Sequence, residues 1–196
     1  MSAACPATSI RNSSRPPSSS PPRAPTRTAP LRRGCAPKAS FRARAGVALL
    51  AEDFFRPTTG DLRRDLAQAA GEGKVLSLWW EREECPYTAL LHQDALRIAE
   101  VRAYPAQCFY TLRLNRYGEE RLIDIDGFAG RQGDVAVRHG VAGTPTMEFR
   151  LADGREVLRL PGYADPAILH AAFEYVQLGG WAHTGIVAWL QQRGLL

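Results

Sequence analysis

Residues 85–88, with the sequence Cys-Pro-Tyr-Thr, are the part of the chain best placed to do chemistry. An apolar segment at 74–80 that predicts a buried strand precedes them, and a segment with helical periodicity at 85–98 begins with them. A thiol at a helix start lies near unpaired backbone N–H groups and the positive end of the helix dipole, which stabilise a thiolate. Cysteines placed in this way have pKa values of roughly 3.5 to 7.5. Strand, loop, Cys-Pro-x-x and helix together are typical of a thiol–disulfide exchange site.

Thr88 stands three residues after Cys85, where a second cysteine would complete a Cys-x-x-Cys pair. Its side chain cannot be oxidised, but its hydroxyl can donate a hydrogen bond to a thiolate one turn away. An ordinary threonine of a first helical turn is an equally open interpretation. Pro86 suits the first turn because its missing N–H costs nothing there, and with Tyr87 it would shape the rim around the thiol. A mixed disulfide at Cys85 could not be resolved by its helix neighbour.

Acidic residues surround the predicted thiol and oppose its ionisation. Glu81, Glu83 and Glu84 come just before Cys85, and only Arg82 offsets their charge locally. The alternative for Cys85 is therefore a small apolar residue that happens to begin a helix.

The predicted elements around this site alternate between helix and strand, which indicates an α/β core of four or so strands. We expect helices at 61–71, 85–98, 131–139, 164–178 and 184–193, strands at 74–80 and 107–114, a connecting stretch at 124–127, and a hairpin of 147–151 with 156–160.

Residues 61–175 resemble the thioredoxin-fold proteins of the SoxW type, a bacterial group often exported to the periplasm and usually carrying Cys-Pro-Tyr-Cys. The matching blocks are Cys-Pro-Tyr at 85–87, Gly-Thr-Pro-Thr at 143–146, and the glycine–tyrosine turn at 160–166. The resemblance implies a thioredoxin-like α/β fold, with a central mixed sheet flanked by helices. It also implies that Thr144 and Pro145 form the cis-proline segment opposite the active cysteine.

The resemblance predicts a single-cysteine thiol–disulfide oxidoreductase that acts through a mixed disulfide at Cys85. Thr88 would be the second catalytic residue. We expect no cofactor, with glutathione or a protein dithiol as the candidate co-substrate, and a disulfide or thiol of a protein or small molecule as the partner. An external thiol would serve as reductant, and we expect a monomer. The substrate-binding residues would be Pro86, Tyr87, Thr144 and Pro145.

Two other functions fit the same residues. A redox-silent module would keep the Thr-Pro groove for an extended peptide and would not use Cys85. A thiol peroxidase is the third interpretation, since glutathione peroxidases also have a Cys-x-x-Thr pattern, but their accompanying Gln, Trp and Asn motifs are not recognisable here. Trp79 and Trp80 would either flank the thiol or pack in the core.

Residues 1–51 differ in composition from the rest of the chain, which predicts a disordered arm ahead of a domain at 52–196. The arm holds nine basic residues, no acidic residue and eight of the 14 prolines, so it cannot bury enough apolar surface to fold. It is a candidate targeting segment or a start codon placed too early. The resemblance implies a periplasmic location; the alternatives are the cytoplasm, or an organelle if the arm is a transit peptide.

Residues 52–196 hold 16 basic and 20 acidic residues, which argues against a nucleic-acid surface. No segment approaches the ~18 apolar residues of a membrane span. Cys5 and Cys35 lie in the arm, and Cys108 is expected to be buried on a strand. No Cys/His cluster has the spacing of a metal site, so we expect no bound metal.

Overall fold

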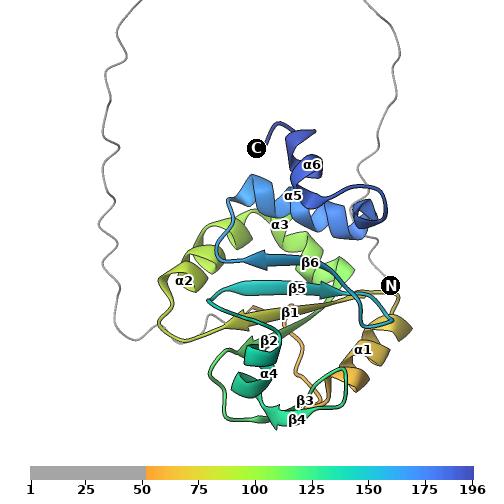
Figure 1. Ribbon diagram of the computed structural model, residues 1–196. Helices are drawn as coiled ribbons and strands as arrows, with labels where there is room; N and C mark the ends of the chain where they lie inside the picture. The colour runs from red at the N-terminus through yellow and green to blue at the C-terminus, as the bar shows by residue number, and fades with distance from the viewer. Residues whose placement is uncertain (1–51) are drawn as a thin grey trace, which may run out of the picture. The chain divides into compact units, whose positions relative to one another are not determined.

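The computed structural model describes residues 52–196 of the chain (Figure 1). The predicted disordered arm, with Cys5 and Cys35, lies outside the described residues. Among the helices that are described, none is long and apolar enough to cross a membrane.

A four-stranded mixed sheet forms the centre of the described part, in the order β2-β1-β5-β6. Strands β1 and β2 are parallel, whereas β5 runs antiparallel to both β1 and β6. A separate two-stranded sheet pairs β3 with β4. The strands are β1 (Val75–Glu81), β2 (Phe109–Asn115), β3 (Arg121–Ile123), β4 (Ala129–Arg131), β5 (Thr146–Arg150) and β6 (Glu156–Pro161).

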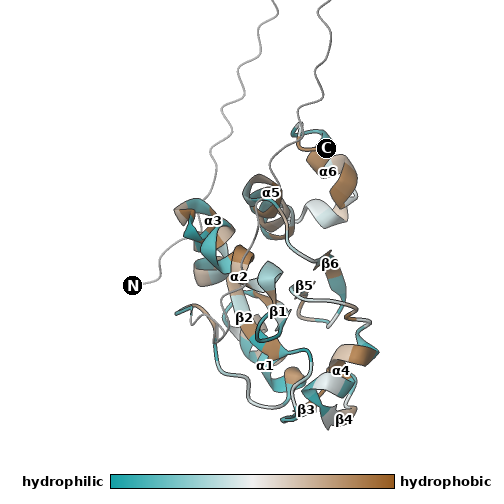
Figure 2. Ribbon diagram, turned by 90° about the vertical axis from the view of Figure 1, so that its left-hand side faces the viewer, coloured by the Kyte–Doolittle hydropathy of each residue, from teal (hydrophilic) through white to brown (hydrophobic). Residues whose placement is uncertain are grey.

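Helices cover both faces of the central sheet, as Figures 1 and 2 show. Helices α1 and α4 lie on one face together with the β3–β4 hairpin; α2, α3 and α5 lie on the other, and α6 packs on α5. This is the mixed sheet flanked by helices that was predicted. The helices are α1 (Leu62–Gly71), α2 (Pro86–Gln93), α3 (Ala99–Ala103), α4 (Gln132–Arg138), α5 (Pro166–Gln177) and α6 (Ile186–Gln191).

Alternation along the strands divides the core into two clusters. Trp79 points toward α2 and α5, whereas Leu78 and Trp80 point toward α1 and α4, and all three are fully buried. On the α5 side, the rings of Phe109, Phe149 and Phe173 have centroids 5.2 to 5.9 Å apart. Both faces of β1 are therefore apolar, which explains its nearly continuous hydrophobic sequence. Because Trp79 and Trp80 lie in the core, they do not flank the thiol.

The helix predicted over 85–98 is interrupted after Gln93. Asp94 is the C-cap of α2, a 3₁₀ turn follows at Ala95–Arg97, Ile98 is extended (φ −81°, ψ 118°), and α3 begins at Ala99. The Asp94 carboxylate accepts a hydrogen bond of 2.5 Å from the hydroxyl of Tyr163, 69 residues away. Since this contact is tertiary, the apolar periodicity of 85–98 could not reveal the break.

The second strand begins at Phe109, two residues later than predicted. Cys108 ends a π-helical segment, Tyr104–Cys108, and packs in the core cluster on the α5 side. It is buried, as predicted, but it does not share a face with Tyr110 and Leu112, which lie in the other cluster. The β3–β4 hairpin was not predicted, because strands of three residues are too short to show an alternating pattern.

Candidate functional site

Cys85 is the N-cap residue of α2 and lies just beyond the C-terminal end of the central strand β1. Its backbone is extended (φ −81°, ψ 116°), its carbonyl accepts the first helical hydrogen bond from Ala89 N (3.0 Å), and Pro86 fills the first turn. Glu84, directly before it, has left-handed backbone (φ 58°), which costs a non-glycine residue about 1 kcal/mol. The thiol is 5% exposed, so it lies just beneath the surface at the helix start.

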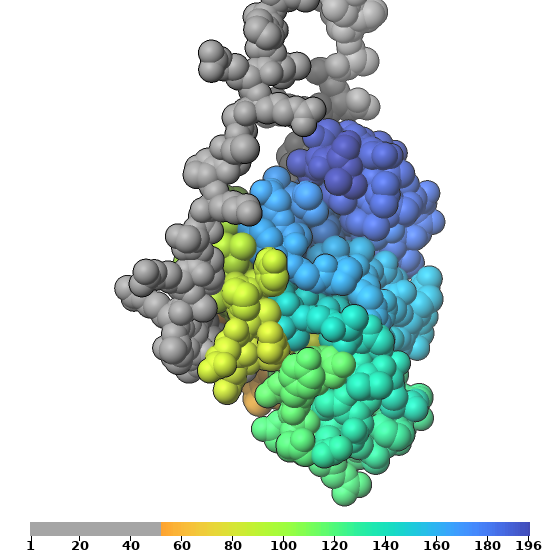
Figure 3. Space-filling model, turned by 60° about the vertical axis from the view of Figure 1, so that its left-hand side comes forward, coloured from red at the N-terminus to blue at the C-terminus, as the bar shows by residue number. Residues whose placement is uncertain are grey.

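The thiol faces the loop that precedes β5. Cys85 Sγ–H donates a hydrogen bond of 3.1 Å to the carbonyl oxygen of Thr144, and the Thr144–Pro145 peptide bond is cis. Pro145 is buried, and its carbonyl accepts from Gly162 N in the turn after β6 (2.7 Å). In Figure 3 the yellow-green residues around the start of α2 lie beside the teal residues of this loop. The structure thus brings together two segments 59 residues apart.

Side chains from three other elements hold the loop from His139 to Pro145 in place. Each of them donates to a different backbone carbonyl, so the loop presents a fixed edge of main chain beside the thiol. The donors are Arg159 Nη1 to His139 O (2.6 Å), Arg116 Nε to Val141 O (2.6 Å) and Thr146 Oγ1 to Gly143 O (2.8 Å).

Burial raises the pKa of the Cys85 thiol, but nearby donors lower it by more, so the pKa lies below its ordinary value. The donors are the hydroxyls of Thr144 and Thr88 and the backbone N–H groups of Thr88 and Tyr87 at the start of α2. The bond from the thiol to the Thr144 carbonyl acts the other way, because only the protonated sulfur can donate it. The positions of the helix-start donors therefore favour a thiolate once that bond is released.

The Thr88 hydroxyl is buried beside the thiol and has no hydrogen-bond partner among the described residues. The Thr88 hydroxyl makes no hydrogen bond of ordinary geometry to the Cys85 thiol. It lies close enough to lower the pKa of that thiol through its dipole. A buried hydroxyl without a partner costs about 1–3 kcal/mol. A thiolate at Cys85 would supply the missing acceptor.

The other predicted site residues lie around the thiol at different depths. Tyr87 is 60% exposed and Pro86 is also exposed, so both form rim surface next to the buried sulfur. Thr144 is half-buried.

Glu81 does not face the thiol as a free charge, contrary to the sequence-based expectation. It is fully buried at the end of β1, and its Oε1 lies 2.9 Å from Nε2 of His92 on α2. Burial lowers the pKa of His92, but bonds to Glu81 and to Glu52 (Nδ1 to Oε1, 3.2 Å) raise it by more. The Glu81 carboxylate is therefore paired with the His92 imidazole beneath the site. No sequence signal indicated this pair, because neither residue belongs to a motif.

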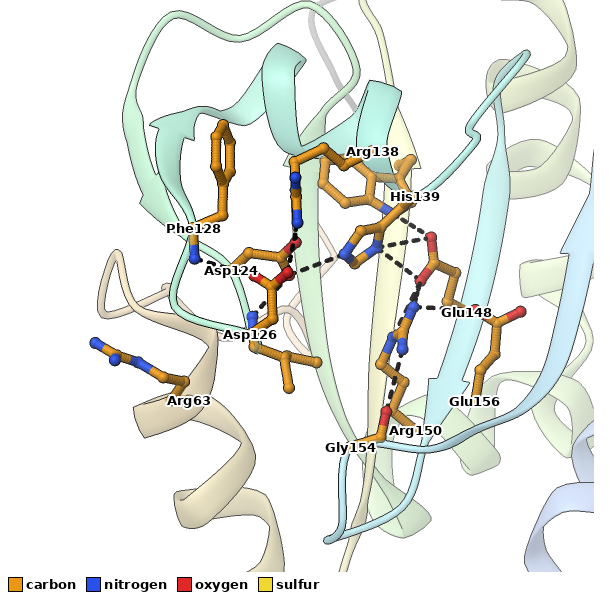
Figure 4. Close-up of polar contacts among 12 residues, drawn as sticks. Arg63, Asp124, Asp126, Phe128, Arg138, His139, Glu148, Arg150, Gly154 and Glu156 are labelled. Atoms are coloured by element: carbon orange, nitrogen blue, oxygen red, sulfur yellow. Dashed lines mark hydrogen bonds and ion pairs between the residues drawn. The ribbon is translucent and has the colours of Figure 1, made fainter.

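A second buried polar cluster lies on the opposite face of the sheet, as Figure 4 shows. His139, at the end of α4, contacts Asp124 (Nε2 to Oδ1, 2.9 Å) and Glu148 on β5 (Nδ1 to Oε2, 2.9 Å). Beside it is a pocket with a volume of about 410 Å³. The arginines that line this pocket, Arg138, Arg150 and Arg159, all bind carboxylates of the protein. Through these contacts the cluster links the end of α4 to β5 and to the connection between β3 and β4.

We expect the stability of the domain to fall in alkaline solution because of His139. Burial lowers its pKa, but Asp124 and Glu148 raise it by more, from 6.5 to about 9. A raised pKa contributes stability that is fully present below pH 6.5 and is lost as the pH rises through about 9. We expect the parent to have a larger free energy of unfolding than His139→Gln at about pH 6. The difference between the two proteins should shrink as the pH is raised to about 10. An advantage that is constant with pH would contradict the assignment.

Among residues 52–196, no group of three or more His, Cys, Asp or Glu side chains has the arrangement of a metal site. The Asp124 carboxylate makes its contacts with His139, Arg138 and Ile125 N and does not contact Cys85.

The model of the thioredoxin-like domain family matches residues 62–177. A solved thioredoxin-fold protein from Helicobacter pylori is 20% identical, with a TM-score of 0.55, and the match covers 63% of this chain and 86% of that one. A thioredoxin from Thermus thermophilus is 23% identical, with a TM-score of 0.48 and coverage of 60% and 84%. The oxidised C-terminal domain of DsbD from Neisseria meningitidis is 15% identical, with a TM-score of 0.46 and coverage of 62% and 97%. No curated protein matches this sequence.

At 20% identity the Helicobacter pylori structure supports the fold alone. The family model covers more than half of the chain, and its match includes Cys85, Thr88, Thr144 and Pro145. The chain belongs to the thioredoxin-like domain family.

Proposed function

We propose that this protein is a thiol–disulfide oxidoreductase that works through Cys85 as a single reactive cysteine. The observation that carries the proposal is the 3.1 Å contact between Cys85 Sγ and the Thr144 carbonyl, which sets a helix-start thiol against a fixed edge of main chain. Proteins with the thioredoxin fold are in general thiol–disulfide oxidoreductases, and membership of the family supports the same assignment.

The first step is attack by the Cys85 thiolate on one sulfur of a disulfide. A bond forms between Cys85 Sγ and that sulfur, and the other sulfur leaves as a thiolate with the bonding electron pair. Once the thiol has lost its proton, the Thr144 carbonyl has no donor and is free to accept a backbone N–H of an extended substrate. Thr88 stabilises the thiolate with its hydroxyl, while Pro86 and Tyr87 form the rim that contacts the substrate.

The second step needs a thiol from outside the active-site helix. Thr88 stands where a resolving cysteine would be, and a hydroxyl does not attack a disulfide. An external thiol, from glutathione or a protein dithiol, attacks the mixed disulfide, takes the substrate half and releases the Cys85 thiolate. No cofactor enters either step. A periplasmic location and a monomeric state remain predictions.

The pH dependence of Cys85 alkylation tests this function. The rate of iodoacetamide labelling should reach half its maximum below pH ~8.5, the ordinary pKa of a cysteine. Cys85→Ser is the control that removes labelling of the site and leaves that of other cysteines. A midpoint at or above the ordinary value would favour the redox-silent peptide-binding module. Rapid oxidation of Cys85 by hydrogen peroxide, without exchange with disulfides, would favour the thiol peroxidase.

Thr88→Val should raise the pKa of Cys85 and move the labelling midpoint to higher pH. Valine keeps the shape of threonine but has no hydroxyl to donate to the thiolate. Because the Thr88 hydroxyl has no partner in the protonated state, the variant should unfold at the same temperature as the parent or higher. An unchanged labelling midpoint would show that Thr88 is an ordinary helix residue.

A further inference from the structure

Arg116 directly follows β2, at the end of the sheet where Cys85 also lies. Its backbone N–H donates to the carbonyl of Glu81 at the end of β1 (2.8 Å), and its Nε donates to the carbonyl of Val141 in the loop before β5 (2.6 Å). The guanidinium carbon lies 5.0 Å from the centre of the exposed Tyr117 ring. The backbone bond holds the residue at the end of β1, and the Nε bond and the ring contact fix the half-buried side chain against the loop that faces the thiol. In Figure 3 the green residues that follow β2 lie below the yellow-green residues and beside the teal ones.

The terminal amino groups of Arg116 make no hydrogen bond or ion pair with any residue from 52 to 196. Other half-buried arginines behave differently: Arg56 binds Glu72, and Arg150 and Arg159 both bind Glu156. Arg116 is held by its Nε, so its plane is set while its Nη1 and Nη2 groups keep their hydrogen-bonding capacity. A fixed planar fork of this kind suits a carboxylate, since little side-chain entropy is lost on binding.

We propose that the small thiol or disulfide that exchanges with Cys85 carries a carboxylate close to its sulfur, and that Arg116 binds this carboxylate. The inference rests on the proposed function and names its substrate class: a cysteine-containing peptide of the glutathione kind. Glu83 and Glu84 are exposed just before Cys85, and their charges attract the ammonium group of such a peptide.

In this scheme the Cys85 thiolate attacks the disulfide of such a peptide, the S–S bond breaks, and one peptide leaves as a thiolate. The other peptide stays bound through a new S–S bond to Cys85, with a carboxylate on Arg116. A second molecule of the peptide thiol, as its thiolate, then attacks the bound peptide sulfur. The peptide disulfide is reformed and Cys85 returns to the thiolate, so electrons balance over the two steps.

The experiment compares two disulfides that differ in charge. The rate of adduct formation on Cys85 is measured by mass spectrometry with glutathione disulfide and with bis(2-hydroxyethyl) disulfide, which has no carboxylate. We expect Arg116→Gln to lower the rate with glutathione disulfide about tenfold, the effect of losing one hydrogen bond to a charged group. The rate with the neutral disulfide should change less than about twofold. Arg116→Lys should retain part of the difference, because the charge remains.

Arg82→Gln is the matched control, since it removes the same charge from the exposed loop before Cys85. If Arg82→Gln lowers the glutathione disulfide rate as much as Arg116→Gln, the effect is general electrostatics and the proposal is wrong. Equal losses with both disulfides in Arg116→Gln would mean that Arg116 acts only by holding Val141, which also overturns it. If neither disulfide reacts with the parent, the oxidoreductase function fails, and the carboxylate site fails with it.

Discussion

Thr88→Cys is expected to turn the protein into an efficient dithiol reductase. Thr88 is buried on the first turn of α2, three residues after Cys85, and its side-chain oxygen has no partner within residues 52–196, so a thiol in the same space breaks no hydrogen bond there. The introduced thiol can attack the Cys85 mixed disulfide within the molecule, which replaces a slow second encounter with a high effective concentration. The rate of insulin disulfide reduction, with a reductant supplied, should rise by at least about tenfold.

Thr88→Ser is the matched control, because it keeps the hydroxyl and adds no thiol; its turnover should equal that of the parent. The parent itself should accumulate as a mixed disulfide that mass spectrometry detects on Cys85. If parent and Thr88→Cys turn over equally fast, an external thiol already resolves Cys85 efficiently and the monothiol argument is wrong. If oxidation forms no disulfide between Cys85 and the introduced cysteine, the two side chains do not share the first turn as the structure has them.

Glu148→Gln is expected to destabilise the domain more than any exposed substitution. Glu148 is fully buried on β5 and accepts from Trp80 Nε1 (2.9 Å), His139 Nδ1 (2.9 Å) and Arg150 Nη2 (2.8 Å). Burial raises the pKa of this carboxyl, but His139 and Arg150 lower it by more, so the native state holds it ionised. Removing its charge leaves buried cations without their counter-ion, a loss of about 3–5 kcal/mol in the free energy of unfolding.

Urea unfolding at neutral pH measures this loss. Glu119→Gln is the control, because Glu119 also binds an arginine, Arg131, at 2.8 Å, but its side chain is 78% exposed. Exposed ion pairs contribute about 1 kcal/mol or less, so the control should be close to the parent. A loss below about 1 kcal/mol in Glu148→Gln would show that the cluster on this face of the sheet does not need the charge.

Local features of the fold could be predicted because their signals lie within a few residues of each other. Asp61 caps α1 by accepting from Arg63 N, and Asp165 caps α5 by accepting from Ala167 N, with proline next in the chain. The hairpin predicted for 147–151 with 156–160 corresponds to β5 and β6, and between them Gly154 has the positive φ (82°) that a glycine allows. The helix that begins after Cys85 was predicted from local signals too: the helical periodicity of the segment and a proline suited to its first turn.

Parts of the site that depend on distant residues could not be derived from such patterns. From its own neighbours Pro145 indicates only a loop, and the family resemblance was needed to predict that Thr144 faces Cys85. Nothing local indicated that Asp94, the C-cap of α2, would bind Tyr163.

The sequence by itself determined where the reactive thiol stands, at the start of a helix after a buried strand, because helix caps and strand alternation are set by adjacent residues. Tertiary structure decided the electrostatics around it. Only packing buried Glu81 against His92, left the Thr88 hydroxyl without a partner among the described residues, and fixed Arg116 on the Val141 carbonyl with no bond from its amino groups to residues 52–196. The physical reason is that a charge or a hydrogen bond acts according to its depth and its distance from its partners, and both are set by contacts between residues far apart in the chain.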